Sequence, residues 1–202
     1  MRRRDFITLL GGAAAAWPPT VRAQTRGVPT VGFLGPTTPK AWTSWTKAFV
    51  DRFAELGRVD GRTIKIVYRW ANGQIERAEE LAAELVALKV DLIVTSGSAT
   101  GSAMKATSQI PILFALASEP VATGYVASLA RPGGNVTGLS LEAPDLAGKR
   151  LAFLRQVAPE SHRLAVLTDV AYLGSVLELD HVKVAAPTLG FDPVPVEIRL
   201  AR

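Results

Sequence analysis

Two short apolar runs, with a small-residue segment between them, constrain the fold of this chain most. The runs are residues 92–94 and 110–116, and the pattern of residues 101–107 predicts a short helix between them. Continuous apolar runs of this length are typical of strands that are buried on both faces of a parallel sheet. Polar loops follow the runs at residues 95–100 and 117–120. Because ligands bind outside the carboxyl ends of the strands in open parallel sheets, both loops are candidate binding loops.

The rest of the chain repeats this alternation of strand and helix. Periodicity and turn residues predict strands at 28–35, 63–71, 136–140, 163–169 and 191–198, and helices at 41–56, 74–88, 121–129, 144–157 and 173–189. Pro187 should end the last helix early, because proline lacks the N–H that a helix interior needs. The alternation indicates an α/β protein with a doubly wound parallel sheet.

The helix expected at 41–56 carries two tryptophans, Trp42 and Trp45, on its apolar face. Helical spacing favours packing in the core over stacking on a ligand. Trp42 is nearer to the loop after the first strand, so it is the better placed of the two for a ligand contact.

The strand count divides the chain unevenly. Five strands are expected before residue 140 and two after residue 141, and two strands with two helices are too few to close a second sheet. We therefore expect a complete first lobe over residues 24–140 and the beginning of a truncated second lobe over residues 141–202. A single seven-stranded sheet is the alternative.

The first 23 residues have the layout of an export signal. A basic start at residues 2–4 precedes an apolar stretch at residues 6–17, and a small residue, Ala23, offers a cleavage site. The apolar stretch is too short to span a bilayer, and the pair Arg3-Arg4 resembles a twin-arginine signal. We expect a periplasmic protein cleaved near Ala23. An N-terminal amphipathic helix of the folded domain is the alternative.

The charge balance does not indicate a nucleic-acid partner. The chain has 23 Lys and Arg residues against 18 Asp and Glu residues, for a formal net charge of +5, and residues 1–23 contain four of the arginines and one of the acids. Most of the excess positive charge therefore lies in the leader. The remainder has no basic stripe with interleaved aromatic residues, so we expect no nucleic-acid binding.

Catalytic and metal-binding patterns are also missing from the sequence. The loop at residues 96–101 matches neither the phosphate-binding glycine patterns nor the GxSxG nucleophile elbow. His162 and His181 come late in the chain, where a Ser-His-acid triad or a metal site would need an improbable geometry, and there is no cysteine. Glu119 could be a general base, although a Glu-Pro pair more often supports the following helix. We expect a protein that is not an enzyme and has no cofactor or metal.

The loop after residue 95 places small residues and hydroxyls at the start of a helix. Free backbone N–H groups and the helix dipole favour an anion at this position, such as a carboxylate. An ordinary N-cap, in which Ser96 or Ser98 serves only the helix, remains the alternative.

Segments along the whole chain, from residue 1 to about 202, carry a resemblance to one protein family. They are RRDF at 3–6, VGFLG at 31–35, YRWANG at 68–73, DLIVTSG at 91–97, IPILFALASEPVATGYVASLARPGGNVTGLS at 110–140 and LAGKRLAFLRQVAP at 146–159. The most specific part is PVATGYVASLARPGGNVTG, at 120–138. Together they resemble the exported substrate-binding proteins of ABC transporters that have the type I periplasmic binding fold. Residues 168–172 differ from the Asn-Pro-rich loop that the resemblance implies there.

The resemblance implies two Rossmann-like lobes that close on a small organic ligand, such as an amino acid or a related carboxylate, and deliver it to a membrane permease. Family members are longer by roughly half, so the second lobe here would be partial. The contacts that the resemblance implies are Gly35, Pro36, Thr37, Ser96, Gly97, Ser98, Thr100, Ala117, Ser118, Glu119 and Ser140. Our physical hypothesis is that Ser98 and Thr100, with the backbone amides, bind the carboxylate. An exported α/β hydrolase and a ligand-sensing domain of the same fold are the alternatives.

Overall fold

The computed structural model describes residues 27–141 and 143–198. The predicted export signal, with its arginine pair and its cleavage near Ala23, lies outside the described residues. The strands are β1 (Thr30–Gly35), β2 (Lys65–Trp70), β3 (Leu92–Thr95), β4 (Ile112–Ala117), β5 (Val136–Ser140), β6 (Arg163–Asp169) and β7 (Asp192–Ile198). The helices are η1 (Lys40–Trp42), α2 (Thr43–Glu55), α3 (Ile75–Ala87), α4 (Ala99–Ala106), α5 (Ala143–Val157), α6 (Leu173–Ala185) and η2 (Pro187–Leu189).

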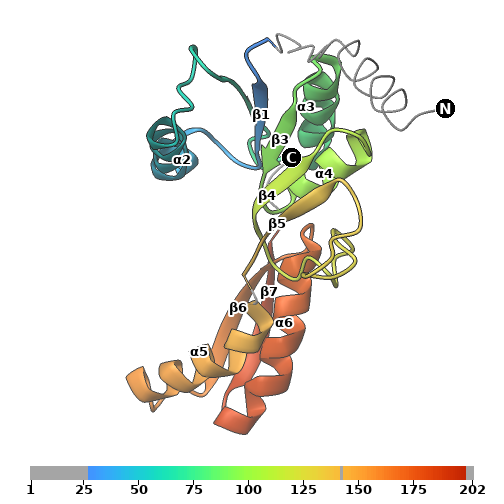
Figure 1. Cartoon of the computed structure of the whole chain (residues 1–202). Helices are drawn as coiled ribbons and strands as arrows, with labels where there is room; N and C mark the ends of the chain where they lie inside the picture. The colour runs from blue at the N-terminus through green and yellow to red at the C-terminus, as the bar shows by residue number, and fades with distance from the viewer. Residues whose placement is uncertain (1–26, 142, 199–202) are drawn as a thin grey trace, which may run out of the picture.

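Five parallel strands form the larger sheet, in the order β2-β1-β3-β4-β5. Helices α3 and α4 cover one face of this sheet, and α2 lies against the other (Figure 1). Helices on both faces of a parallel sheet define the doubly wound arrangement that the sequence predicted. The apolar run of β3 is buried at Ile93 and Val94, as expected of a strand covered on both sides.

The two faces of the larger sheet have different cores. On the side of α3 and α4, aliphatic residues such as Leu34, Leu85 and Ile93 are fully buried with Phe114. On the side of α2 the contacts are aromatic, and the Phe33 ring packs within 5.4–6.1 Å, between ring centroids, of Trp42, Phe49, Tyr68 and Trp70. Trp42 is thus a packing residue, as expected. The same prediction is wrong for Trp45, which is 67% exposed.

A second, separate sheet contains the parallel strands β6 and β7. The alternative of one seven-stranded sheet is therefore wrong. Helices α5 and α6 pack together with this sheet around buried Leu151, Ala186 and Phe191. Arg155 lies over the Phe191 ring, 3.8 Å from its centroid, and its Nε donates to the Leu189 carbonyl. Helix α6 ends at Ala185 and a 3-10 turn begins at Pro187, as the proline predicted.

One predicted element is wrong: residues 121–129 form turns and bends, not a helix. The N–H groups of Tyr125 and Val126 both donate to the Pro120 carbonyl, which closes the chain into a tight turn. Gly124 adopts φ +75°, a left-handed conformation that interrupts a right-handed helix and suits glycine. Val126, an apolar residue of this segment, is buried in the turn and not on the face of a helix.

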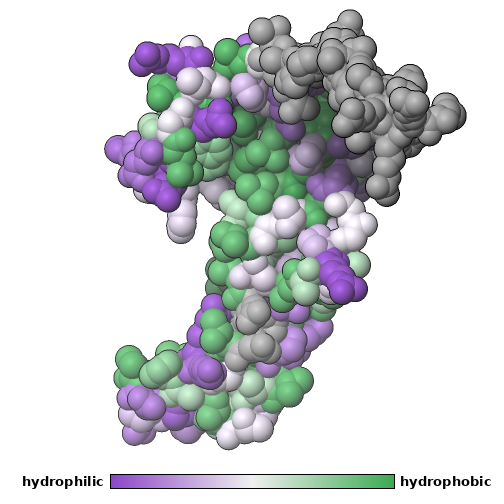
Figure 2. Space-filling view, viewed as in Figure 1, coloured by the Kyte–Doolittle hydropathy of each residue, from purple (hydrophilic) through white to green (hydrophobic). Residues whose placement is uncertain are grey.

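Hydrophobic side chains remain at the surface of both sheets. Figure 2 shows apolar surface over the middle of the molecule, beside α2. Leu139 of β5 is 68% exposed and Leu167 of β6 is 67% exposed. Among the described residues, no helix combines the length and hydrophobicity needed to cross a bilayer.

Candidate binding site at the carboxyl ends of β1, β3 and β4

Three of the predicted loops meet because β1, β3 and β4 are neighbours in the sheet. The Thr95 hydroxyl donates to the Leu34 carbonyl at 3.0 Å and joins the end of β3 to β1. The Ser96 hydroxyl and the Gly97 N–H both donate to the Leu116 carbonyl, at 3.1 Å each, and join the next loop to β4. The carboxyl ends of these strands point toward the smaller sheet and α6 (Figure 1). This is the edge at which open parallel sheets bind ligands.

The loop after β1 is held by neighbours on its outer side. Gly35 is buried, and Pro36 and Thr37 are half-buried. The Thr37 hydroxyl accepts a hydrogen bond from Trp42 Nε1 at 3.0 Å. The Pro36 carbonyl accepts from the N–H of Gly73 at 2.8 Å. These contacts hold the loop at the carboxyl end of β1.

The loop after β3 leads directly into α4. Gly97 adopts φ +54°, and the resulting sharp turn starts the helix immediately after the strand. Ser96 is buried, and its hydroxyl bond to β4 holds the loop against that strand. Ser98 is the N-cap of α4 and is half-buried, and among the described residues its side chain makes no capping hydrogen bond. The simple N-cap alternative is therefore not what the structure shows.

Thr100 is the unusual side chain of this loop. It is fully buried, and its Oγ1 atom has no hydrogen-bond partner among the described residues. A buried hydroxyl without a partner costs about 1–3 kcal/mol, and such groups in native structures often have a functional or a hydration explanation. Thr100 lies in the first turn of α4, where backbone N–H groups and the helix dipole favour an anion.

The loop after β4 contains a residue in an unfavourable backbone conformation. Glu119 adopts φ +50°, although it is not glycine. Its carbonyl accepts hydrogen bonds from the Thr123 N–H and hydroxyl, at 2.8 Å each, which hold this turn in place. Backbone conformations of this kind concentrate at functional sites. Ala117 and Ser118 are buried, and Ser140, the register partner of Ala117 on β5, is half-buried.

Tyr172 reaches this edge from the other sheet, and sequence reasoning missed it. The backbone N–H of Ser118 donates to the Tyr172 hydroxyl at 3.1 Å, across 54 residues of sequence. Tyr172 is the N-cap of α6 and lies in the short connection after β6, which ends at Asp169. The carboxyl end of β6 therefore lies beside the carboxyl end of β4. Its position is the signal that could have found it, because Tyr172 lies between a strand and a helix, as the loops after β1 and β3 do.

Tyr125 is a second tyrosine at this edge. Its ring packs against Phe114 with 6.4 Å between centroids. Burial, and to a lesser extent the nearby Tyr172, raises the pKa of Tyr125 to about 12, against a lowering by its hydrogen bond with the Gly101 backbone. The phenol is therefore neutral at physiological pH and contributes no charge to the site.

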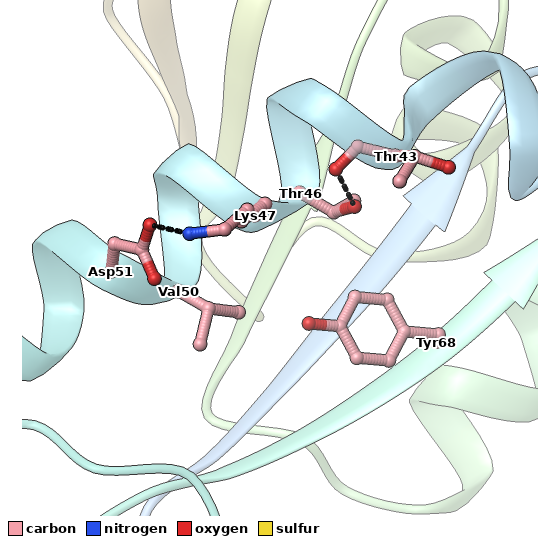
Figure 3. A pocket seen from close by; sticks show the side chains of 6 residues that line it. All are labelled: Thr43, Thr46, Lys47, Val50, Asp51 and Tyr68. Carbon is pink, nitrogen blue, oxygen red and sulfur yellow. Dashed lines mark hydrogen bonds and ion pairs between the residues drawn. The ribbon is translucent and has the colours of Figure 1, made fainter.

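A groove of about 280 Å³ lies elsewhere, between α2 and β2 (Figure 3). It is lined by Thr43, Thr46, Lys47, Val50, Asp51 and Tyr68. The Lys47 ammonium and the Asp51 carboxylate form an exposed ion pair of 2.5 Å, which contributes little stability. Burial, and then the charge of Asp60, raises the pKa of Tyr68. The described lining residues belong to α2 and β2, so the groove lies apart from the three loops.

The described residues contain no cluster of three or more His, Cys, Asp and Glu side chains that could hold a metal ion. His162 and His181 are exposed on the part of the chain that forms the smaller sheet and its helices. The chemistry that the loops do offer is hydrogen bonding from hydroxyls and backbone N–H groups, with an electropositive helix terminus.

The sequence matches the family model described as ABC transporter substrate binding protein over residues 39–200. Among curated proteins, a tyrosine-binding protein of Clostridioides difficile (strain R20291) is 31% identical over 139 residues. That alignment covers 66% of this chain and 39% of the relative. The chain thus spans well under half of the curated relative that it matches.

Solved structures show the same fold. The ABC domain of a Streptococcus pneumoniae protein, in complex with L-Trp, superimposes with a TM-score of 0.79 and 24% identity. The ligand-free, open structure of a Clostridium difficile substrate binding protein with adhesive properties gives a TM-score of 0.60 and 29% identity. These similarities cover 86% and 85% of this chain, respectively, and 58% of each neighbour.

Proposed function

Because the chain belongs to the family of ABC transporter substrate binding proteins, we propose that it captures a small organic carboxylate, in the first instance an amino acid, at the loops after β1, β3 and β4. The lobe of residues 24–140 supplies the first wall of the cleft, and residues 141–202 begin the second. The bound solute passes to a membrane permease. Closure of the two parts around ligand is a hinge motion.

The observation that carries this proposal is the start of α4, where the unpaired hydroxyl of Thr100 is buried and becomes accessible to a ligand once the side chains that cover it move. Half-buried Ser98 lies two residues before it and supplies a second hydroxyl. An entering carboxylate needs hydrogen-bond donors and a positive potential, and the start of α4 provides both. The remaining contacts in this proposal are Gly35, Pro36, Thr37, Ser96, Gly97, Ala117, Ser118, Glu119 and Ser140.

The relatives narrow the ligand class. One curated relative is named as a tyrosine-binding protein, and one structural neighbour holds L-Trp. The aromatic cluster around Phe33 lies beneath the loop after β1, because Trp42 bonds Thr37 in that loop. An aromatic amino acid would present its carboxylate to α4 and its ring toward a hydrophobic part of the cleft. We therefore choose L-tyrosine and L-tryptophan as probes.

A thermal-shift measurement tests the proposal on the full chain. A ligand that binds only the native state stabilises it by about 2.7 kcal/mol at a hundredfold excess over Kd, which raises the Tm. We expect L-tyrosine or L-tryptophan to raise the Tm, and L-tyrosinamide, which lacks the carboxylate, to do so far less. A Tm that does not respond to either amino acid, or that responds equally to the amide, contradicts the proposed carboxylate site.

We propose that the protein is located in the periplasm, because residues 1–23 have the layout of an export signal. Replacing Arg3-Arg4 by Lys-Lys should keep the protein in the cytoplasm if export uses a twin-arginine route. The mass of the protein recovered from the periplasmic fraction should correspond to a chain that starts at Gln24. A periplasmic protein of full mass would contradict the cleavage at Ala23.

A further inference from the structure

The contact between Ser118 and Tyr172 joins the two sheets at the candidate site. Ser118 follows β4, and its N–H points to the Tyr172 hydroxyl at 3.1 Å, a good hydrogen-bond distance. Ser118 is buried, whereas Tyr172 is half-buried. A backbone N–H that projects beyond the end of a strand is the kind of donor that a ligand oxygen would use. In this structure a side chain of the protein uses it instead.

The position of the Tyr172 ring is fixed from its own side. Tyr172 is the N-cap residue of α6, and its carbonyl accepts from the N–H groups of Ser175 and Val176. Gly174 lies under the ring: a β-carbon there would come within 2.7 Å of the ring carbon Cζ. Gly174 has a helical position without positive φ, so the close approach of the ring is what requires glycine.

The other side of the contact belongs to the candidate site. Leu116, two residues before Ser118, accepts hydrogen bonds from Ser96 and Gly97 of the loop that starts α4. Glu119, the next residue, has the left-handed backbone conformation that turns the chain away from the sheet. The Ser118 N–H therefore lies between the loop of Ser98 and the turn at Glu119, within the set of contacts proposed for the ligand.

We propose that Tyr172 is an affinity-determining residue that competes with the ligand: its hydroxyl accepts the hydrogen bond of the Ser118 N–H and must leave before a ligand oxygen can bind there. This inference rests on the proposed function, since it names a residue that regulates the same site. The Tyr172 hydroxyl comes from the start of α6, which packs with the smaller sheet. A ligand that takes its place on the Ser118 N–H therefore also breaks a contact between the two sheets.

The first test needs no ligand. Amide hydrogen exchange at Ser118 should be slow in the full wild-type chain and about two- to tenfold faster in Tyr172→Phe, the range expected when one neutral hydrogen bond is lost. Gly174→Ala should have the same effect, because its methyl group displaces the ring without touching Ser118. Tyr68→Phe, which removes a phenol hydroxyl near α2, is the matched control and should leave exchange at Ser118 unchanged.

The second test measures the affinity for L-tyrosine and L-tryptophan by calorimetry. Tyr172→Phe should lower Kd by about two- to tenfold relative to wild type, because the ligand no longer displaces a hydrogen bond. A higher Kd would make Tyr172 a direct ligand contact and would overturn the competition. An unchanged Kd would overturn it as well.

The two readouts separate this inference from the proposed function. Faster exchange with no binding of either amino acid by either protein would contradict the proposed function and reduce Tyr172 to a contact between the sheets. Binding by wild type with unchanged exchange in Tyr172→Phe would leave the proposed function intact and overturn the role of Tyr172. Faster exchange together with tighter binding supports both.

Discussion

The indole of Trp70 lies over the Cα atom of Gly35, in the space that a side chain at residue 35 would need. The two residues are register partners on the adjacent parallel strands β2 and β1. Gly35 is the last residue of β1 and opens the first candidate binding loop. This glycine therefore allows the aromatic cluster to extend to the edge of the site.

Gly35→Ala should destabilise the protein by about 1–3 kcal/mol, because the added methyl group overpacks the core against Trp70. Chemical denaturation gives the free energy of unfolding, and tryptophan fluorescence of the native state should change as the indole moves. Gly134→Ala is the matched control, since a β-carbon there meets no atom within 4 Å and the backbone has no positive φ. Equal stabilities of the two variants would contradict the packing described here.

Thr100→Val separates a binding role from a structural one. The hydroxyl is buried without a partner among the described residues, so its replacement by a methyl group should leave the stability unchanged or raise it by about 1 kcal/mol. The same substitution should weaken the binding of L-tyrosine, and adding Ser98→Ala should weaken it further. Denaturation and calorimetry on the same variants measure both effects.

A loss of stability in Thr100→Val would show that the hydroxyl has a structural partner, such as an ordered water. Unchanged affinity in the double variant would contradict the proposed carboxylate contact. Ser128→Ala is a suitable control, because its hydroxyl serves only the turn at Arg131 in the described structure.

The sequence was most informative where one local signal dominated. The apolar run of β3 has few competing interpretations, and the polar loop after it was correctly placed at the sheet edge beside β4. The proline at residue 187 ended α6 as predicted. In both cases the decisive interaction is local: burial of a short strand, and a missing backbone donor.

The failures have a common physical cause, which is that contacts distant in sequence decided the outcome. The apolar face of the helix predicted burial for Trp45, but Trp45 is exposed. The residues that pack against the sheet are Trp42, at the end of η1, and Phe49, Val50 and Phe53 of α2. Residues 121–129 look helical, yet Gly124 and the Pro120 carbonyl make a turn. The place of Tyr172 between a strand and a helix marks it as a candidate, but only the contact with Ser118 shows that β6 ends beside β4.

Tyr125 should make the stability of the protein fall at high pH. Its pKa is about 12 in the folded protein, against an ordinary value of 10.0. Between these values the unfolded chain has released the phenol proton while the folded chain keeps it, so the folded state binds more protons. The free energy of unfolding then decreases as the pH rises. The contribution of Tyr125 is present in full below pH 10 and is lost toward pH 12.

Denaturation of wild type and of Tyr125→Phe at several pH values tests this expectation. The difference in the free energy of unfolding between the two proteins should be constant below pH 10 and should change between pH 10 and 12. A difference that stays constant throughout would show that Tyr125 titrates normally in the folded state. The comparison between the two proteins cancels the titration of all other groups that the substitution does not disturb.

The exposed leucines of the two sheets should promote self-association. Leu139 on β5 and Leu167 on β6 are about two-thirds exposed, at 68% and 67%. Exposed apolar side chains on sheets favour association with other chains. Replacing both residues by threonine introduces a β-branched side chain, which is favoured in strands, while removing apolar surface. Sedimentation or light scattering should then show a smaller fraction of associated species at the same concentration.

Leu88→Thr is the matched control for that change. Leu88 is 53% exposed, but it follows helix α3 and does not belong to either sheet. Its replacement removes a similar apolar side chain from the surface without altering a sheet face, so the degree of association should stay near that of wild type. If Leu88→Thr and the double variant reduced association equally, total surface hydrophobicity would be the cause. The sheets would then have no special part in association.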